Sequence, residues 1–238
     1  MIPENPILVA LDVESAEDAI RLAGRVGAQV GGFKIGLRLL SGPGPGVIGA
    51  LARMDKPVLA DAQLHDIPSQ VEAAATRLGE FGARWVTAHA GGGRAMLEAA
   101  VSGLKLGAGD RPAGVLGVTV LTSLGLDDIT EAGFAGSPGK LTSRLARLAQ
   151  RAGCEGVVCS PRELGVVGEV APDLLKVAAG IRPGGPTGDD QSRVATPAEA
   201  LNWGADLLVI GRPIIAASDP GGAAADIWGQ VRVARDPA

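Results

Sequence analysis

The sequence contains no tyrosine, and only 3% of its 238 residues are aromatic. Hydrophobic residues nevertheless make up 46% of the chain, so a core must be built mainly from Ala, Val, Leu and Ile. These residues are typical of parallel sheets covered by helices, and the composition therefore favours an α/β protein over a β-sandwich. A chain of this length forms either one α/β barrel or two small domains.

An excess of positive charge and long hydrophobic runs are also missing. The formal net charge is −4 and the pI is near 5.3, so no global positive field would hold DNA or RNA. The longest apolar runs are far shorter than the roughly 20 residues of a membrane span, and residues 1–5 lack a basic segment that leads into an apolar run. We expect a cytoplasmic protein with neither a nucleic-acid nor a membrane partner.

Cysteine is scarce. Cys154 and Cys159 have no further Cys or His at the spacing of metal ligands, and two cysteines in a chain of this size form no disulfide framework. The pattern predicts no bound metal and fits a reducing compartment.

Short apolar runs alternate about eight times with longer segments of helical period, as in a closed parallel barrel. Each run has the length of a strand: residues 7–11, 32–35, 57–60, 85–88, 114–120, 156–159, 174–178 and 207–210. The Gly/Pro clusters at 41–46 and 182–188 have the length of loops, not of interdomain linkers. We therefore predict one (β/α)8 barrel domain over residues 1–238.

Several expected helices have clear starts. Ser15 is followed by Asp18, and Thr196 by Glu199, so that each start places an oxygen acceptor at the cap and a carboxylate three residues later. These signals fix where the segments between the strands begin as helices.

Polar residues follow or end most of the expected strands, at the end of a barrel that carries function. They are Asp12, Lys34, Asp61, His89, Thr122, Ser123, Ser160, Arg182 and, directly after Gly211, Arg212. Any one of them could cap a helix or satisfy a buried backbone group. Together they place two carboxylates, an ammonium and two guanidinium groups around one rim, a costly arrangement unless the charges pair or bind a ligand.

The last two expected loops have the composition of an anion site. Residues 182–188 offer exposed backbone amides, Gln191 lies just beyond them, and Gly211-Arg212 follows the final strand. Barrels often bind phosphate at this place. The Gly/Pro content alone would equally describe a disordered loop, and Arg212 favours phosphate.

The segment 61–68 reads Asp-Ala-Gln-Leu-His-Asp-Ile-Pro and is the most specific feature. Asp61 and Gln63 would share the pocket if an extended strand continued, because residues two apart point to the same side. Asp66 precedes Pro68, which suits the first turn of a helix. The alternative makes Asp66 a helix cap and Asp61 an ordinary loop residue.

Taken together, these motifs resemble the orotidine 5′-phosphate decarboxylase family. That family combines an Asp after the first strand, a Lys on the second, a D-x-K-x-x-D-I-P segment after the third, and a phosphate-binding site formed by the segments after the seventh and eighth. The resemblance runs from Leu8 to about Arg212. Its further stretches are residues 10–12, 33–36, 64–68, 89–92, 120–123, 156–160, 180–183, 190–191 and 211–212.

The resemblance implies a role for each matching residue. Asp12 would hold the ribose, Lys34 and Asp61 would belong to the charged catalytic chain, and Thr122 would touch the pyrimidine. The phosphate would be surrounded or directly bound by Arg182, Gln191, Gly211 and Arg212. Asp66 and Ile67 would reach into the neighbouring subunit's site, since the family's sites lie at a homodimer interface. No metal or organic cofactor is implied.

Two positions depart from the family pattern. Gln63 stands where the family has the lysine of D-x-K-x-x-D, and Gln70 stands where a Thr is usual. In the family, that lysine gives a proton to carbon six of the pyrimidine as carbon dioxide leaves. A neutral amide can donate a hydrogen bond but is not a comparable general acid. Gln63 is either a natural change or an engineered one.

Three functions remain open from the sequence. The first is an orotidine-monophosphate decarboxylase that produces uridine monophosphate, with a rate reduced by Gln63. The second is a nucleotide-binding homologue without catalysis. The third is a related sugar-phosphate decarboxylase or aldolase; such enzymes usually use magnesium and lack the context of residues 65–68.

Overall fold

The computed structural model describes residues 3–185 and 193–235 of the chain. Within these residues eight strands form a closed barrel in sequence order, and each strand runs parallel to its neighbours. The strands are β1 (Ile7–Ala10), β2 (Gly32–Ile35), β3 (Val58–Leu64), β4 (Trp85–His89), β5 (Gly114–Val118), β6 (Gly156–Cys159), β7 (Leu175–Ala178) and β8 (Leu207–Ile210). The predicted (β/α)8 barrel is confirmed.

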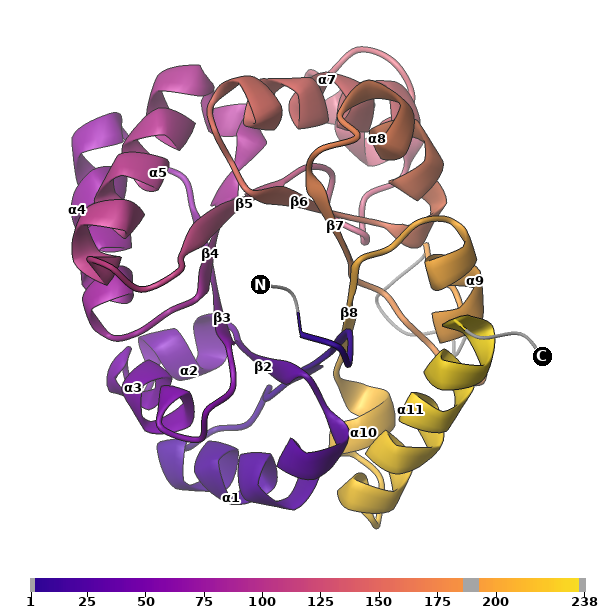
Figure 1. Ribbon diagram of the computed structural model, residues 1–238. Coiled ribbons are helices and arrows are strands. Elements are labelled where there is room, and N and C mark those ends of the chain that lie inside the picture. The colour runs from indigo at the N-terminus through magenta and orange to yellow at the C-terminus, as the bar shows by residue number, and fades with distance from the viewer. Residues whose placement is uncertain (1–2, 186–192, 236–238) are drawn as a thin grey trace.

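Helices connect the strands and surround the barrel on all sides (Figure 1). They are α1 (Ala16–Val26), α2 (Leu37–Ser41), α3 (Gly46–Ala52), α4 (Pro68–Glu80), α5 (Arg94–Ala108), α6 (Leu126–Glu131), α7 (Pro138–Arg151), α8 (Leu164–Val170), α9 (Pro197–Asn202), α10 (Arg212–Ile215) and α11 (Pro220–Arg235). Short 3-10 helices are η1 (Gly27–Gln29), η2 (Ala90–Gly92) and η3 (Pro161–Glu163). Both predicted helix starts are confirmed. The side chain of Ser15 accepts a hydrogen bond from the backbone N–H of Asp18, and Thr196 forms a reciprocal capping box with Glu199.

The hydrophobic core has two parts. The larger part lies between the barrel and its helices. The smaller part fills the interior of the barrel and contains Leu8, Leu59, Trp85, Leu116, Val177 and Leu207. Successive side chains of a strand point to opposite faces, so Asp12, four positions after Leu8, and Asp61, two positions after Leu59, also point inward. The inner apolar layer therefore forms the floor beneath the polar end of the barrel.

The expected strand bounds are off by one or two residues at several strands, β5 for example ending at Val118 instead of residue 120, and the largest difference is in β3. The sequence pattern ends the third strand at residue 60, whereas β3 continues to Leu64. Its pairing with β4 shifts register between Ala60 and Leu64: Ala60 pairs with Val86, and Leu64 pairs with Ala88. Two additional residues are therefore accommodated on β3 as a bulge, a feature that redirects side chains near functional sites.

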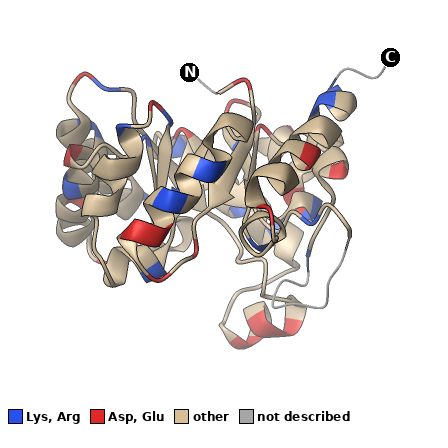
Figure 2. Ribbon diagram, turned by 90° about the horizontal axis from the view of Figure 1, so that it is seen from below, with Lys and Arg blue, Asp and Glu red and all other residues tan. Residues whose placement is uncertain are grey.

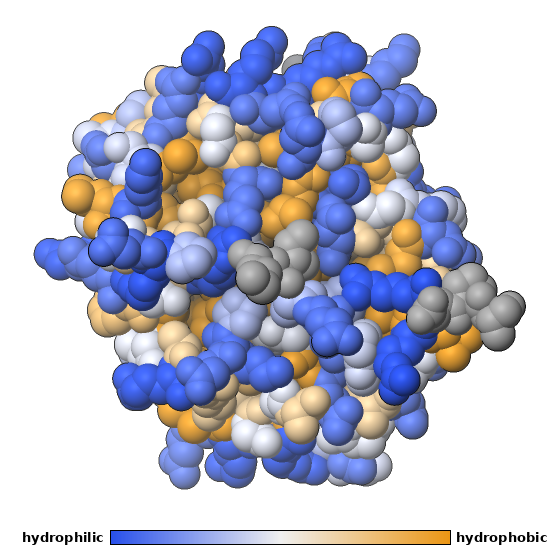
Figure 3. All heavy atoms as spheres, in the orientation of Figure 1, coloured by the Kyte–Doolittle hydropathy of each residue, from blue (hydrophilic) through white to orange (hydrophobic). Residues whose placement is uncertain are grey.

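The two ends of the barrel differ in character. Ion pairs between Arg84 and Glu155 and between Lys176 and Asp206 lie where strands begin. The face seen in Figure 3 carries many hydrophilic side chains. At the other end, away from both termini, the short acidic helix α6 projects beyond the strands (Figure 2). No described helix is both long and apolar enough to cross a membrane.

Candidate active site

A cavity of about 200 Å³ opens at the carboxyl ends of the strands. Its walls contain eight of the residues that the sequence singled out: Asp12, Lys34, Asp61, Gln63, Thr122, Arg182, Gly211 and Arg212. Cys159 also lines the cavity, and burial raises the pKa of its thiol to about 12, so the thiol stays protonated at neutral pH. The cavity therefore gathers charged groups from strands that are distant in sequence.

Lys34 lies between two carboxylates on the inner wall of the barrel. Its Nζ is 3.2 Å from Oδ1 of Asp12 and 3.4 Å from Oδ2 of Asp61. Burial acts to lower the pKa of Lys34, but Asp61 and Asp12 outweigh that effect, and the net pKa is raised. A side chain at Gly36 would come within 3.1 Å of this ammonium, so glycine keeps the space beside Lys34 open.

We predict that the stability contributed by Lys34 is lost at alkaline pH. Because the pKa of Lys34 is raised in the folded state, its contribution to stability is fully present below the ordinary value of 10.5 and is lost as pH rises through the folded-state pKa. The difference in unfolding free energy between the wild type and Lys34→Met should therefore shrink above pH 10.5. Denaturant unfolding of both proteins at several pH values above and below 10.5 measures this difference. The effects of titratable groups that both proteins share cancel in it. A difference that stays constant would contradict the assignment.

The bulge in β3 determines how Gln63 enters the cavity. Gln63 has φ 48°, in the left-handed region, so it reaches the pocket through a turn of the backbone and not through the continued extended strand that the sequence suggested. Its backbone N–H donates to Oγ1 of Thr87 at 2.8 Å, and this hydroxyl donates to Oδ1 of Asp61 at 2.9 Å. Thr87 is fully buried and fixes both cavity residues at once.

The side chain of Gln63 is held from β4. Its Oε1 lies 2.9 Å from Nε2 of His89. The imidazole of His65 stacks on that of His89, with the ring centroids 5.4 Å apart. Burial lowers the pKa of His89, and His65 adds to the effect while Asp61 opposes it, so His89 is neutral at pH 7.

Two arginines lie on the side of the cavity formed by the last two strands. Arg182 follows β7, is 5% exposed, and donates to the carbonyl oxygen of Ile181. Arg212 begins α10 directly after Gly211 and is exposed. Gln191, predicted to join this group, lies outside the described residues. Both arginines thus line the same cavity, and guanidinium groups suit an anion such as phosphate; that one binds here stays a prediction of the loop composition.

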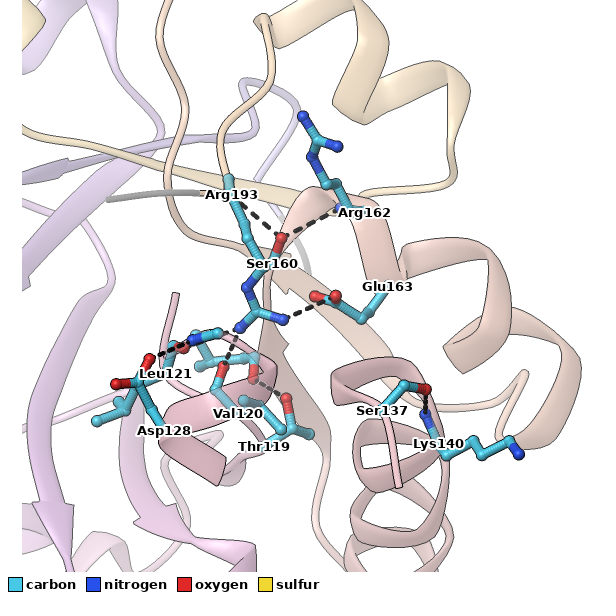
Figure 4. Close-up of polar contacts among 12 residues, drawn as sticks. Thr119, Val120, Leu121, Asp128, Ser137, Lys140, Ser160, Arg162, Glu163 and Arg193 are labelled. Atoms are coloured by element: carbon cyan, nitrogen blue, oxygen red, sulfur yellow. Dashed lines mark hydrogen bonds and ion pairs between the residues drawn. The ribbon is translucent and has the colours of Figure 1, made fainter. Parts of the chain in front are cut away.

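A buried ion pair holds the loop that carries Thr122. Arg193 is 2.8 Å from Oε1 of Glu163, and it donates to the carbonyl oxygens of Leu121 at 2.8 Å and Val120 at 3.3 Å (Figure 4). The side chains of Arg193 and Glu163 are 11% and 8% exposed. Segments that follow β5, β6 and β7 are thereby joined beside the cavity.

Three predicted residues lie away from the cavity of this chain. Asp66, Ile67 and Gln70 are exposed around the start of α4, and the side chain of Asp66 accepts the N–H of Ile67 at 2.6 Å. The exposed fraction of Ile67 is 62%. Pro68 is the first residue of α4, as predicted, but the residue at the helix cap is Ile67 and not Asp66.

Sequence reasoning missed Thr87, Glu163 and Arg193, and it singled out His89 at the end of the fourth expected strand without assigning it a contact. The alternation of β4 could have found Thr87, since it lies with His89 on the strand face that includes inward-pointing Trp85. Glu163 and Arg193 are 30 residues apart in short connecting segments, and no local pattern links them.

Comparison with known proteins agrees with this geometry. The model of the Orotidine 5'-phosphate decarboxylase / HUMPS family matches residues 5–227. Orotidine 5'-phosphate decarboxylases of Anaeromyxobacter sp. (strain K) and Paramagnetospirillum magneticum are 47% and 45% identical, and each match covers 94% of this chain and 97% of the relative. The chain belongs to this family.

Two solved structures have the same fold as this chain. The crystal structure of orotidine 5'-phosphate decarboxylase from Lactobacillus acidophilus superposes with a TM-score of 0.84 at 34% identity, over 96% of this chain and 99% of that one. An uncharacterized conserved protein from Geobacillus kaustophilus superposes with a TM-score of 0.81 at 31% identity. The resemblance inferred from the motifs is therefore confirmed at the level of the orotidine 5′-phosphate decarboxylase family.

Proposed function

We propose that the protein binds orotidine 5′-monophosphate in the barrel cavity and decarboxylates it to uridine 5′-monophosphate in cytoplasmic pyrimidine biosynthesis, at a rate that Gln63 lowers. The observation that carries this proposal is the pairing of Lys34 with Asp12 and Asp61 on one wall of a cavity whose other side holds Arg182 and Arg212. Membership of the orotidine 5′-phosphate decarboxylase family supports the assignment of substrate.

The two sides of the cavity suit the two ends of such a nucleotide. Arg182, Gln191 and Arg212 would bind the phosphate, with Gly211 leaving space beside Arg212. Asp12 would accept hydrogen bonds from the ribose hydroxyls. The pyrimidine would then lie over Lys34 and Asp61, with Thr122 at its edge.

Decarboxylation breaks the bond between carbon six and the substrate carboxylate. The electron pair stays on carbon six and must be stabilised until a proton arrives. Asp61 disfavours the substrate carboxylate electrostatically, and Lys34 supplies positive charge close to the carbanion; both effects favour the transition state over the bound substrate. The missing agent is the proton donor, since Gln63 has no titratable proton.

Gln63 also favours a second candidate, a nucleotide-binding protein that no longer turns over its ligand. Without a second ammonium, the carboxylates near carbon six are balanced by Lys34 alone, which weakens carbanion stabilisation as well as proton transfer. The phosphate and ribose contacts do not depend on Gln63, so binding would persist.

Mixing the protein with orotidine monophosphate and following its absorbance distinguishes these functions. Turnover supports the decarboxylase. Tight binding of uridine monophosphate in calorimetry, with no turnover, supports the binding protein. A protein that folds but binds neither nucleotide would overturn both proposals and direct attention to another substrate.

Replacing Arg212 by Ala is expected to weaken the binding of uridine monophosphate by more than about 1.5 kcal/mol, the low end for hydrogen bonds to charged groups. The guanidinium would pair bidentately with the phosphate. Isothermal titration measures the change, and Arg147→Ala, which removes an exposed arginine on α7, serves as the control. Equal affinity of the Arg212→Ala variant and the wild type would show that the phosphate binds elsewhere.

We further propose that the protein is a homodimer in which Asp66, Ile67 and Gln70 approach the partner's cavity. The support is their position: they follow directly on the cavity strand β3, yet their side chains are exposed in the single chain. An isoleucine that is 62% exposed beside a carboxylate is suited to an interface.

The dimer predicts a solution mass close to twice the 23.9 kDa chain. Ile67→Lys should shift the protein toward monomer in sedimentation and weaken nucleotide binding. Val233→Lys, at an apolar position of α11 that is 72% exposed, should not. A wild-type monomer at micromolar concentration that still binds uridine monophosphate would rule out a shared site.

A further inference from the structure

The polar contact between Gln63 and His89 defines which end of the amide faces the cavity. Gln63 lines the cavity, whereas His89 lies behind it on β4. The Oε1 atom of Gln63, 2.9 Å from Nε2 of His89, is a carbonyl oxygen and can only accept a hydrogen bond. His89 must therefore donate from Nε2, and the amide NH2 of Gln63 is left on the other side.

We propose that His89 is a positioning residue for position 63: its Nε2–H holds the Gln63 carbonyl oxygen, so that the amide NH2 is the group presented to a bound nucleotide. This inference rests on the proposed function for the identity of the ligand. The contact itself is a property of the protein without ligand.

The surroundings of His89 support this arrangement. The stacked ring of His65 restricts rotation of the imidazole, and the left-handed backbone of Gln63 is fixed by Thr87. Among the described residues, the amide nitrogen of Gln63 has no hydrogen-bond partner in the protein. Two N–H donors are thus available to a ligand in the cavity that Asp61 also lines.

The consequence is a preference among pyrimidine nucleotides. A nucleotide with an oxygen acceptor on carbon six, such as the carboxylate of orotidine monophosphate, can accept a hydrogen bond from the held NH2 group. Uridine monophosphate carries only a hydrogen at that carbon and gains nothing from it. A substitution of His89 should therefore change the affinity for orotidine monophosphate and leave the affinity for uridine monophosphate unchanged.

The contact also makes the tautomer of His89 depend on the side chain at position 63. Lysine has three donors and no acceptor. In a Gln63→Lys variant, the neutral imidazole must therefore offer its Nε2 lone pair to the ammonium and carry its proton on Nδ1. A change of residue 63 should thus switch the tautomer of His89.

Nitrogen NMR of the labelled protein without ligand tests the contact directly. The chain has only two histidines, and the spectrum of a His65→Phe variant identifies the signals of His89. We expect a neutral His89 with its proton on Nε2 in the wild type and on Nδ1 in Gln63→Lys. A wild-type Nε2 without a proton, or an unchanged tautomer in Gln63→Lys, would overturn the proposal.

Ligand affinity gives a second readout. His89→Phe keeps a ring that can stack on His65 but removes the donor. It should weaken the binding of orotidine monophosphate, measured by stopped flow before turnover, by about three- to tenfold, the range for one hydrogen bond. Uridine monophosphate affinity should be unchanged.

His65→Phe is the matched control and should alter neither affinity. An equal loss for both nucleotides in His89→Phe would mean that His89 only supports the fold, and the positioning role would be wrong. A wild-type protein that shows the expected tautomer but binds neither nucleotide would contradict the proposed function and leave the contact standing.

Discussion

Replacing Gln63 by Lys is expected to raise the rate of orotidine monophosphate decarboxylation by at least about 100-fold, the lower limit usual for a positioned general acid. Asp61 and Lys34 remain in place in the cavity, and the group that the proposed reaction lacks is the proton donor. Most of the electrostatic preorganisation should therefore be present already. The new ammonium would also balance the carboxylate of Asp61 and place a second positive charge beside the carbanion.

The structure offers the new side chain a defined place. The backbone at residue 63 is held by Thr87 through its N–H, a contact that does not depend on the side chain. A neutral His89 can accept a hydrogen bond from the ammonium where it now donates to the amide. Gln63→Met has a similar volume but no donor, and it should give no gain in rate.

Gln70 limits the gain if, in the proposed dimer, it has reshaped the pocket. The increase should then appear only when Gln70→Thr is added, and a double-mutant cycle would show this as coupling between the two positions. Suppose that the single and double variants fold and bind uridine monophosphate but do not turn over orotidine monophosphate. The decarboxylase assignment would then have to be given up in favour of a binding protein.

The barrel and the inner cavity wall were predictable because both depend on short periods. Eight apolar runs set the strands, and alternation along β1 and β3 turns Asp12 and Asp61 inward above Leu8 and Leu59. Lys34 is paired with both carboxylates because parallel neighbours place equivalent strand ends together. No tertiary information is needed for this much of the site.

The conformation at Gln63 was not predictable in the same way. Glutamine has no special preference for positive φ, so nothing in the local sequence indicates the left-handed turn. The bulge arises from the pairing of β3 with β4, in which Leu64 comes to lie opposite Ala88. The contact with His89 depends on this bulge, and an extended strand would have aimed the amide differently.

Removing Arg193 is expected to destabilise the protein by about 3–5 kcal/mol, the cost of leaving a buried charge without its partner. In Arg193→Ala, the carboxylate of Glu163 would stay in the interior, at 8% exposure, without a cation. The second Glu163 oxygen already lacks a hydrogen-bond partner within the described residues, so little else is available to satisfy it. Chemical denaturation measures the loss, and Arg147→Ala, on the exposed face of α7, should change stability by less than about 0.5 kcal/mol.

The same variant should also weaken nucleotide binding, for a separate reason. Arg193 donates to the carbonyl oxygens of Val120 and Leu121, which directly precede Thr122 in the wall of the cavity. Without these hydrogen bonds the loop after β5 loses the contact that fixes its position, and Thr122 is less well placed to meet the pyrimidine. The loss of stability and the loss of affinity thus come from two different contacts of one side chain.

A double variant separates the two effects. Arg193→Met combined with Glu163→Leu removes both buried charges and replaces them with apolar groups, so it should recover most of the stability that Arg193→Ala loses. It restores no donor to the carbonyl oxygens of Val120 and Leu121, so its affinity for uridine monophosphate should stay low. A double variant no more stable than Arg193→Ala would show that the ion pair is not the source of the cost. Recovery of full affinity together with stability would show that Arg193 acts only through the fold and does not position the loop that carries Thr122.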